Sequence, residues 1–204
     1  MRKNKTIAFV NSNRSWGGGE KWHMDIAQRF LDKGYHILFI VHKNSKLLHE
    51  LQYYNFHYVA VDINNFSFVN PLKTLKLVKI FRKHQVDAVI MNLPSDVKVA
   101  GPAAKQAGIN KIIYRRGTAL PVHNNLYNRF LFKHVITHII TNSYETKNIL
   151  LKKNSGLVDQ NKIHVIYNGI DFKALDSRPV QQYYSDTGSE LVLGNMGRLV
   201  EQKG

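Results

Sequence analysis

The chain has 204 residues, of which 44% are hydrophobic and 21% are charged, a composition typical of soluble folded proteins and unlike that of disordered or fibrous ones. The absence of cysteine excludes disulfide bonds, a thiol nucleophile and a cysteine-ligated metal, and it suits a reducing compartment, so we expect a cytoplasmic protein. No apolar run approaches the roughly 18 residues of a membrane span, and the formal net charge of +15 predicts attraction to nucleic acid, anionic lipid or a polyanionic substrate.

Short runs of β-branched and aromatic residues predict seven strands, and segments with apolar residues three or four positions apart predict helices. In chain order the strands cover residues 6–11, 36–42, 57–62, 88–92, 111–114, 138–141 and 162–167, with helical spacing over 20–31, 72–81 and 126–135. Parallel strands need crossover connections, which intervening helices supply. The sequence therefore predicts an α/β fold with a doubly wound, Rossmann-like parallel sheet.

A glycine-rich turn follows the first strand and leads into the first helix, with Gly17, Gly18 and Gly19 directly before Glu20. Glycines let the backbone come close to a bulky anion, and the free amides of a helix start favour a phosphate. The alternative is a flexible turn with Glu20 placed near the positive end of the helix. The turn is neither a G-x-G-x-x-G fingerprint nor a Walker loop, which disfavours nicotinamide and ATP binding.

The segment 71–84 is basic and amphipathic. The spacing predicts an apolar helical stripe of Leu72, Leu75, Val78 and Phe81, and lysines lie beside it at positions 73, 76, 79 and 83. An ordinary crossover helix has this pattern. The alternative is a helix attracted to anionic lipid, which the segment 124–133 could join through its apolar and basic residues.

Ligands of open parallel sheets bind outside the carboxyl ends of the strands, so the loops after the predicted strands should converge on a site. Asn142 and Glu145 fit a helix N-cap and capping box, and the Asn-Gly pair at 168–169 fits a tight turn. Other residues of these loops could line a cleft. The candidate cleft-lining residues are Arg115, Arg116, Asn142, Ser143, Asn168 and Asp171.

The end of the chain predicts a linker and the start of another domain. Residues 174–189 are polar and without a clear period, and an apolar strand begins near Glu190. The loop after it holds Arg198 and Lys203, which could clamp a diphosphate or form a solvated basic turn. We therefore divide the chain into a Rossmann-like domain over 1–172, a linker over 173–189 and the first strand and loop of a second domain over 190–204.

Three motifs occur together: the glycine turn, Asn168-Gly-Ile-Asp171, and Gly197-Arg-Leu-Val-Glu-Gln-Lys-Gly204. In this order they resemble the GT-B glycosyltransferases of retaining family 4. The resemblance implies the acceptor-side domain of an enzyme that transfers a sugar from a nucleotide sugar to a saccharide or lipid-linked acceptor, in surface polysaccharide or lipopolysaccharide synthesis. It also implies donor-phosphate contacts and no metal or other cofactor. The implied phosphate-binding residues are Gly17, Gly18, Gly19, Arg198 and Lys203.

The sequence departs from the family pattern at one point. Many relatives have a histidine after the fifth strand, where this chain has Tyr114-Arg-Arg-Gly-Thr118. The family's paired glutamates would lie after Gly204, so we expect the chain to be inactive alone. Alternatives are a basic polyanion-binding α/β module without catalysis and a nucleotide-sugar epimerase of similar fold. The chain lacks the interleaved basic and aromatic pattern that is typical of specific nucleic acid binding, so we expect no specific nucleic acid partner. We further expect peripheral attachment to an anionic membrane at its inner face.

Overall fold

The computed structural model describes residues 5–152, 156–177, 179 and 193–194. The chain divides into two units, Met1–Asn168 and Gly169–Gly204. The first unit holds the sheet. The described part of the second unit includes the short helix α7, Phe172–Asp176.

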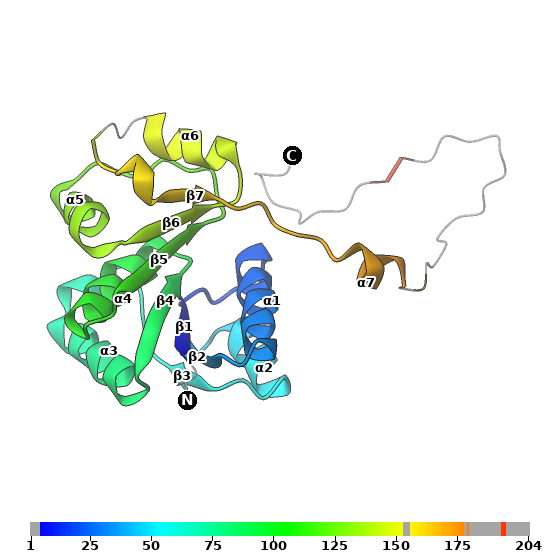
Figure 1. Cartoon of the computed structure of the whole chain (residues 1–204). Coiled ribbons are helices and arrows are strands. Elements are labelled where there is room, and N and C mark those ends of the chain that lie inside the picture. The colour runs from blue at the N-terminus through cyan, green and yellow to red at the C-terminus, as the bar shows by residue number, and fades with distance from the viewer. Residues whose placement is uncertain (1–4, 153–155, 178, 180–192, 195–204) are drawn as a thin grey trace. The chain divides into compact units, whose positions relative to one another are not determined.

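The described residues of the first unit form one seven-stranded sheet in the order β3-β2-β1-β4-β5-β6-β7 (Figure 1). Every neighbouring pair is parallel, which confirms the predicted doubly wound fold. The chain runs outward from β1 to β3 and then returns to β4 beside β1, so the strand order reverses between these two strands. The strands are β1 Thr6–Asn11, β2 His36–Val41, β3 Tyr58–Ala60, β4 Val86–Met91, β5 Lys111–Arg116, β6 His138–Thr141 and β7 Ile163–Val165.

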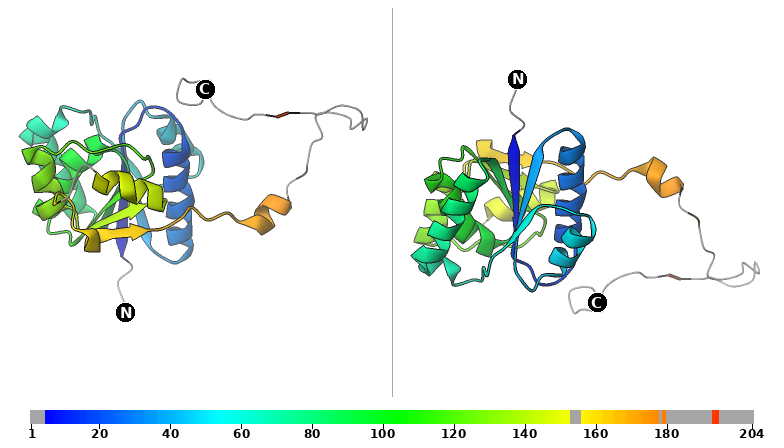
Figure 2. Two further views of the ribbon diagram at one scale, coloured as in Figure 1. Left: turned by 90° about the horizontal axis from the view of Figure 1, so that it is seen from above. Right: turned by 90° about the horizontal axis from the view of Figure 1, so that it is seen from below.

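Helices cover both faces of this sheet. Figures 1 and 2 show α1 and α2 on one face and α3, α4 and α5 on the other. The helix α6 lies against β6 and β7. The bounds are α1 Gly18–Asp32, α2 Lys46–Tyr53, α3 Pro71–Lys83, α4 Pro94–Gln106, α5 Leu126–Phe130 and α6 Tyr144–Lys152, with short turns η1 Ser67–Val69, η2 Leu131–Val135 and η3 Gln160–Lys162. Among the described residues, no helix combines the length and hydropathy that a bilayer span requires.

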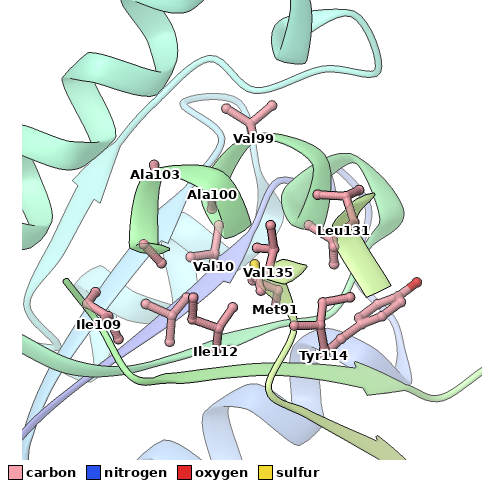
Figure 3. Close-up of a cluster of buried hydrophobic side chains, with 14 of the residues drawn as sticks. Val10, Met91, Val99, Ala100, Ala103, Ile109, Ile112, Tyr114, Leu131 and Val135 are labelled. Atoms are coloured by element: carbon pink, nitrogen blue, oxygen red, sulfur yellow. The ribbon is translucent and has the colours of Figure 1, made fainter. Parts of the chain in front are cut away.

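Two hydrophobic cores form because successive side chains of a strand point to opposite faces. In β1, Ala8 and Val10 belong to the larger core with α3, α4 and η2 (Figure 3). Ile7 and Phe9 belong to the smaller core beneath α1 and α2. Strands buried on both faces have continuous apolar runs, which explains why these segments were readily predicted.

The predicted stripe of α3 is wrong in its first half. Val78 and Phe81 are buried together with Leu77, whereas Leu72 and Leu75 are exposed. A helix turns about 100° per residue, so a strict three-residue spacing drifts by about 60° at each step. Leu72 therefore lies nearly opposite Phe81 and cannot share its face.

This difference gives a matched test of stability. Leu77→Ala should lower the free energy of unfolding by about 2–5 kcal/mol, because it leaves a cavity in a packed core. Leu72→Ala on the same helix should change it by no more than about 0.5 kcal/mol, since Leu72 is 72% exposed and Leu77 is 0% exposed. Urea unfolding measures both, and equal losses would contradict the assigned face of α3.

Candidate functional site

The carboxyl ends of four central strands meet in one hydrogen-bonded seam. Each loop contacts the next, from the loop after β1 to the start of α4, from the end of β4 to β5, and from the end of β5 to the loop after β6. The bonds are Ser12 N to Asp96 Oδ1 at 3.1 Å, Arg115 Nη1 to Asn92 Oδ1 at 3.2 Å, and Asn142 Nδ2 to the Gly117 carbonyl at 3.2 Å. The predicted loops therefore converge on one edge of the sheet.

The three glycines of the first turn have different surroundings. A Cβ atom on Gly19 would lie 2.2 Å from Asn92 Nδ2, so the close approach at Gly19 is made by a side chain of the same protein. Gly18 has open space, since among the described residues no heavy atom would lie within 4 Å of such a Cβ atom. α1 begins at Gly18, and the first amides of a helix have no acceptor within it. Gly18 is thus the glycine that leaves room for a ligand.

Glu20 stabilises the turn before α1. Its side chain is buried, and Oε1 accepts hydrogen bonds from Asn11 Nδ2 at 2.9 Å and from Asn13 Nδ2 at 3.0 Å. The sequence indicated only a favourable position near the helix start. The structure shows that this carboxylate joins the end of β1 to α1.

Arg115 and Arg116 are the last two residues of β5, not loop residues as their predicted strand end implied. Arg115 is 5% exposed, and its Cζ atom lies 4.8 Å from the centre of the Trp22 ring. Burial lowers the pKa of Arg115, and nearby Glu20 opposes that shift. Arg115 therefore lies in the interior beneath the start of α1.

Arg116 points to the other face, as alternation along a strand requires. Its Nη1 donates to Tyr114 Oη at 3.1 Å, and its Nη2 donates to the Leu120 carbonyl. Within the part of the chain that the structure describes, Arg116 Nε has no hydrogen-bond partner. Arg116 thus holds the loop after β5 by its backbone.

Asn142 and Ser143 both bond to groups of the protein. Asn142 Oδ1 accepts from Thr146 Oγ1 at 2.8 Å, and Ser143 Oγ accepts from Thr146 N at 3.1 Å. Ser143 is therefore the cap of α6, and the predicted cap formed by Asn142 with Glu145 is wrong by one residue. Asn142 instead bonds to the loop after β5.

Two further predicted residues lie near the boundary between the units. Asn168 is exposed and is the last residue of the first unit, and Asp171 is exposed in the second unit. Arg198 and Lys203 lie outside the described residues. Their roles remain predictions.

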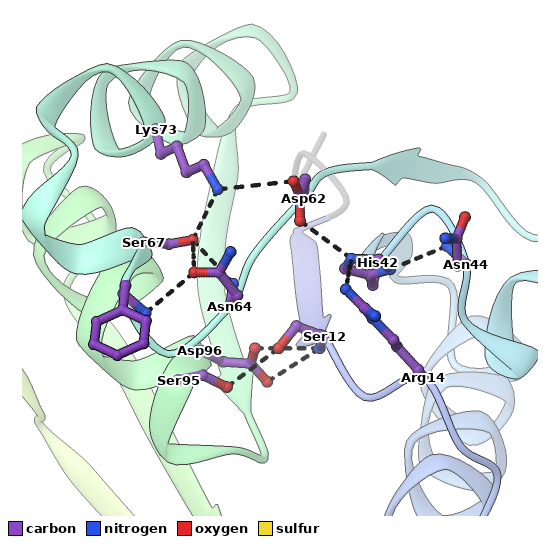
Figure 4. A network of polar contacts seen from close by, with 11 residues as sticks. Ser12, Arg14, His42, Asn44, Asp62, Asn64, Ser67, Lys73, Ser95 and Asp96 are labelled. Carbon is purple, nitrogen blue, oxygen red and sulfur yellow. Dashed lines mark hydrogen bonds and ion pairs between the residues drawn. The ribbon is translucent and has the colours of Figure 1, made fainter.

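Asp96 is a buried carboxyl group that the sequence analysis missed. It accepts from Ser12 N and from Leu93 N, the latter at 3.3 Å, and Ser12 Oγ contacts Ser95 Oγ at 3.2 Å (Figure 4). Burial raises the pKa of Asp96 to about 7, against the opposite effect of the hydrogen bonds from Ser12 and Leu93. The sequence pattern that could have revealed Asp96 is Pro94 at a helix start with an acidic residue two positions later, where a carboxylate can accept a hydrogen bond from a backbone amide.

His42 and Asp62 form a histidine and carboxylate pair within a polar network (Figure 4). His42 Nδ1 accepts from Asn44 N at 3.0 Å, and Nε2 lies 3.1 Å from Asp62 Oδ1 and 3.3 Å from Arg14 Nη2. Lys73 lies 4.0 Å from the other Asp62 oxygen and lowers the pKa of Asp62. Both ring nitrogens of His42 are thus in contact with other groups of the protein, so we interpret the pair as structural.

The described residues contain no group of three histidine or acidic side chains that could hold a metal ion. His23 on α1 is fully buried beside Phe9 and Trp22, and neither ring nitrogen has a hydrogen-bond partner among the described residues. Burial, with Arg115 nearby, lowers the pKa of His23 to about 3. His23 is therefore a neutral core residue.

A doubly wound sheet with a glycine turn at the switch between β1 and β4 is the arrangement of Rossmann-like α/β domains, in which ligands bind at such a switch point. The chain belongs to Glycosyltransferase Family 4, whose sequence profile matches residues 16–174. This match confirms the resemblance. No curated protein sequence matches the chain.

Similar solved structures include several glycosyltransferases. A glycosyltransferase from Rickettsia africae ESF-5 is 22% identical with a TM-score of 0.72, covering 85% of this chain and 45% of that one. HepE from Anabaena, in complex with UDP-glucose, is 18% identical with a TM-score of 0.65, covering 82% and 45%. The lipopolysaccharide outer core galactosyltransferase WaaB is 15% identical with a TM-score of 0.59, covering 81% and 46%.

The similar structures also include a UDP-GlcNAc 2-epimerase from Methanocaldococcus jannaschii, at 16% identity and a TM-score of 0.52, covering 79% of this chain and 45% of that one. At such identities the likeness establishes the fold alone. The chain spans about 45% of the length of the first of these structures.

Asp96 predicts a pH dependence of stability. The folded state keeps the Asp96 proton up to about pH 7, whereas the usual pKa is 3.8. This contribution to stability is therefore fully present below pH 3.8 and is lost as pH rises through about 7. The difference in unfolding free energy between the unmodified chain and Asp96→Asn should fall across this window by up to about 1.4 kcal/mol per pH unit.

Urea unfolding at pH 4, 5.5 and 8 measures this difference. The exposed Asp25→Asn variant is the control and should show no such trend. A difference for Asp96→Asn that is constant with pH would contradict the protonated state of Asp96.

Proposed function

We propose that this chain is the acceptor-side part of a retaining glycosyltransferase that moves a sugar from a nucleotide sugar to a saccharide or lipid-linked acceptor. The observation that carries the proposal is the family match over residues 16–174, which includes the turn whose Gly18 is open at the carboxyl edge. HepE, a structure of the same fold, was solved with UDP-glucose, which supports a UDP-sugar as the donor.

In the proposed reaction the bond between the sugar's anomeric carbon and the donor phosphate breaks, and a bond to an acceptor hydroxyl oxygen forms on the same face. The acceptor hydroxyl gives up its proton to solvent as the new bond forms, and the departing nucleoside diphosphate gains negative charge. Amides at Gly17, Gly18 and Gly19 and the cations Arg198 and Lys203 would stabilise that charge. With this neutralisation supplied by the protein, the proposal requires no metal or cofactor.

A hydrogen-exchange experiment tests the donor contact. UDP-glucose should slow amide exchange over residues 18–20, because phosphate oxygens would accept hydrogen bonds from these amides, and glucose alone should not. The amides of β6, away from the turn, are the internal control. Unchanged exchange throughout residues 12–21 would contradict the proposed phosphate contact.

We further propose a role in surface polysaccharide or lipopolysaccharide synthesis at the inner face of the membrane. WaaB, a solved structure of the same fold, is a lipopolysaccharide outer core galactosyltransferase, which supports a lipopolysaccharide acceptor. Exposed apolar residues in α3, in α5 and in or directly before η1 support contact with lipid: Phe66, Val69, Leu72, Leu75, Leu126 and Phe130. We call this set the apolar rim.

Two contacts bring the parts of the apolar rim together. The Phe68 and Tyr127 rings lie 5.0 Å apart, and Tyr127 Oη donates to the Lys98 carbonyl at 2.6 Å, so η1 and α5 both pack beside α4. Exposed lysines accompany the rim at positions 76, 79, 83 and 133. Apolar side chains flanked by cations suit an anionic bilayer, where each basic residue near the surface contributes about 1 kcal/mol.

Vesicle flotation tests this surface. Recovery with phosphatidylcholine vesicles should rise when anionic phosphatidylglycerol is included. The double variant Phe66→Ser with Leu72→Ser should reduce the partition coefficient at least about ten-fold, because two apolar side chains no longer insert. Leu31→Ser, at an exposed apolar position of α1, is the matched control. Equal recovery of all variants with both vesicle types would refute membrane attachment.

An epimerase is the second candidate, favoured by the UDP-GlcNAc 2-epimerase of similar fold. Product analysis of the whole enzyme, of which this chain would be the acceptor-side part, separates the two activities. A transferase releases UDP in step with a glycosylated acceptor, whereas an epimerase alters the sugar without any acceptor.

A further inference from the structure

Two glycines in the seam are contacted closely by polar side chains of the same protein. A Cβ atom on Gly117 would lie 2.2 Å from Arg115 Nη1, and a Cβ atom on Gly19 would lie 2.2 Å from Asn92 Nδ2. Real Cβ contacts are longer than 3.0 Å, so the two positions allow only glycine while these side chains stay in place. Arg115 and Asn92 thus fill the space that both glycines leave.

The two side chains are also bonded to each other. Arg115 Nη1 donates to Asn92 Oδ1 at 3.2 Å, which directs the amide nitrogen of Asn92 toward Gly19. The Arg115 Cζ atom also lies 4.8 Å from the centre of the Trp22 ring, so the guanidinium packs directly against α1 as well. The contacts therefore run from Gly117 through Arg115 and Asn92 to the first turn of α1.

We propose that Arg115 is a positioning residue for phosphate binding at the start of α1. The inference rests on the proposed function. Arg115 is almost fully buried and bonds to Asn92, so it acts by holding the first turn of α1 against β4 and not by contacting the anion. The positive charge of Arg115 also attracts the negative charge of Glu20, which is buried at the same turn.

This role differs from that of an ordinary packing residue. Anion binding at a helix start depends on several amides pointing at one place, and support from neighbouring side chains lowers the cost of ordering them. Gly18 has open space around it, whereas Gly19 beside it packs closely against the Asn92 side chain. Arg115 therefore orders the turn without closing its open side.

Titration calorimetry with inorganic pyrophosphate tests the proposal on the full chain, with thermal unfolding measured in parallel. Arg115→Met should weaken pyrophosphate binding about ten-fold, because the turn loses its support. Asn92→Ala should weaken it to a similar extent. The double variant should be no weaker than either single one, because both changes break the same contact.

Lys162→Met is the matched control, since it removes the same charge at the end of η3, directly before β7 and therefore at the amino edge of the sheet. Lys162 Nζ donates to the carbonyls of Phe132, Lys133 and Ile136, so its loss should lower the unfolding temperature without changing the pyrophosphate affinity. A merely structural role for Arg115 would give this same pattern.

The outcomes separate the two proposals. Normal binding by the unmodified chain and by Arg115→Met would overturn the positioning role and leave the proposed function intact. Additive effects of Arg115→Met and Asn92→Ala would mean that Arg115 contacts the anion itself, which also overturns it. No binding by the unmodified chain would refute the phosphate contact of the proposed function, and the role of Arg115 with it.

Discussion

Burial of the central strands on both faces is the constraint from which the rest of the structure follows. β1 places Ala8 and Val10 in one core and Phe9 in the other, so its side chains cannot be polar until the strand ends. Asn11 is its last residue, and polar groups follow at once in the loop. In β4 the residues from Ala88 to Met91 are likewise apolar, and Asn92 follows them. Polar groups of these two strands therefore lie at the strand ends, and those at the carboxyl ends face the loops of the candidate site.

Polar groups confined to a protein interior must find partners, because an unpaired buried polar group costs about 1–3 kcal/mol. At this edge the partners come from neighbouring loops. The Asp96 carboxyl group accepts a hydrogen bond from the backbone amide of Ser12. Glu20 accepts one from the side-chain amide of Asn11, and Arg115 donates one to Asn92. These bonds fix the loops relative to one another before any ligand is present. A site assembled in this way needs little rearrangement on binding, which favours affinity.

Much of the fold could be predicted from the sequence, because strands buried on both faces appear as continuous apolar runs. The helix α4 was missed, since its buried side chains are mostly small and Pro102 lies inside it, so neither spacing nor propensity indicates a helix. The stripe of α3 was half wrong, because three-residue spacing rotates around a helix. Each error arose where local spacing was used without knowledge of the opposing surface.

The candidate site could be located from the sequence but not described. The glycine turn and the two arginines were predicted at the correct edge. That Gly19 is filled by Asn92, or that adjacent arginines enter different cores, depends on contacts between residues far apart in the chain. Asp96 has a local signal, a proline followed by an acid at a helix start, but its burial comes from β1. Spacing along one strand carries no information about the neighbouring loop.

The net charge of +15 can now be divided between the interior and the surface. Arg115 and Arg116 lie at the carboxyl edge, yet both guanidinium groups bond to other residues of the protein. Exposed cations lie both near the glycine turn, at Arg14 and Lys21, and along α3 beside the apolar rim, at positions 76, 79 and 83. The first group lies close in sequence to Gly18, where a small anionic donor would bind. The second group lies beside exposed apolar side chains, a combination that suits an extended anionic surface.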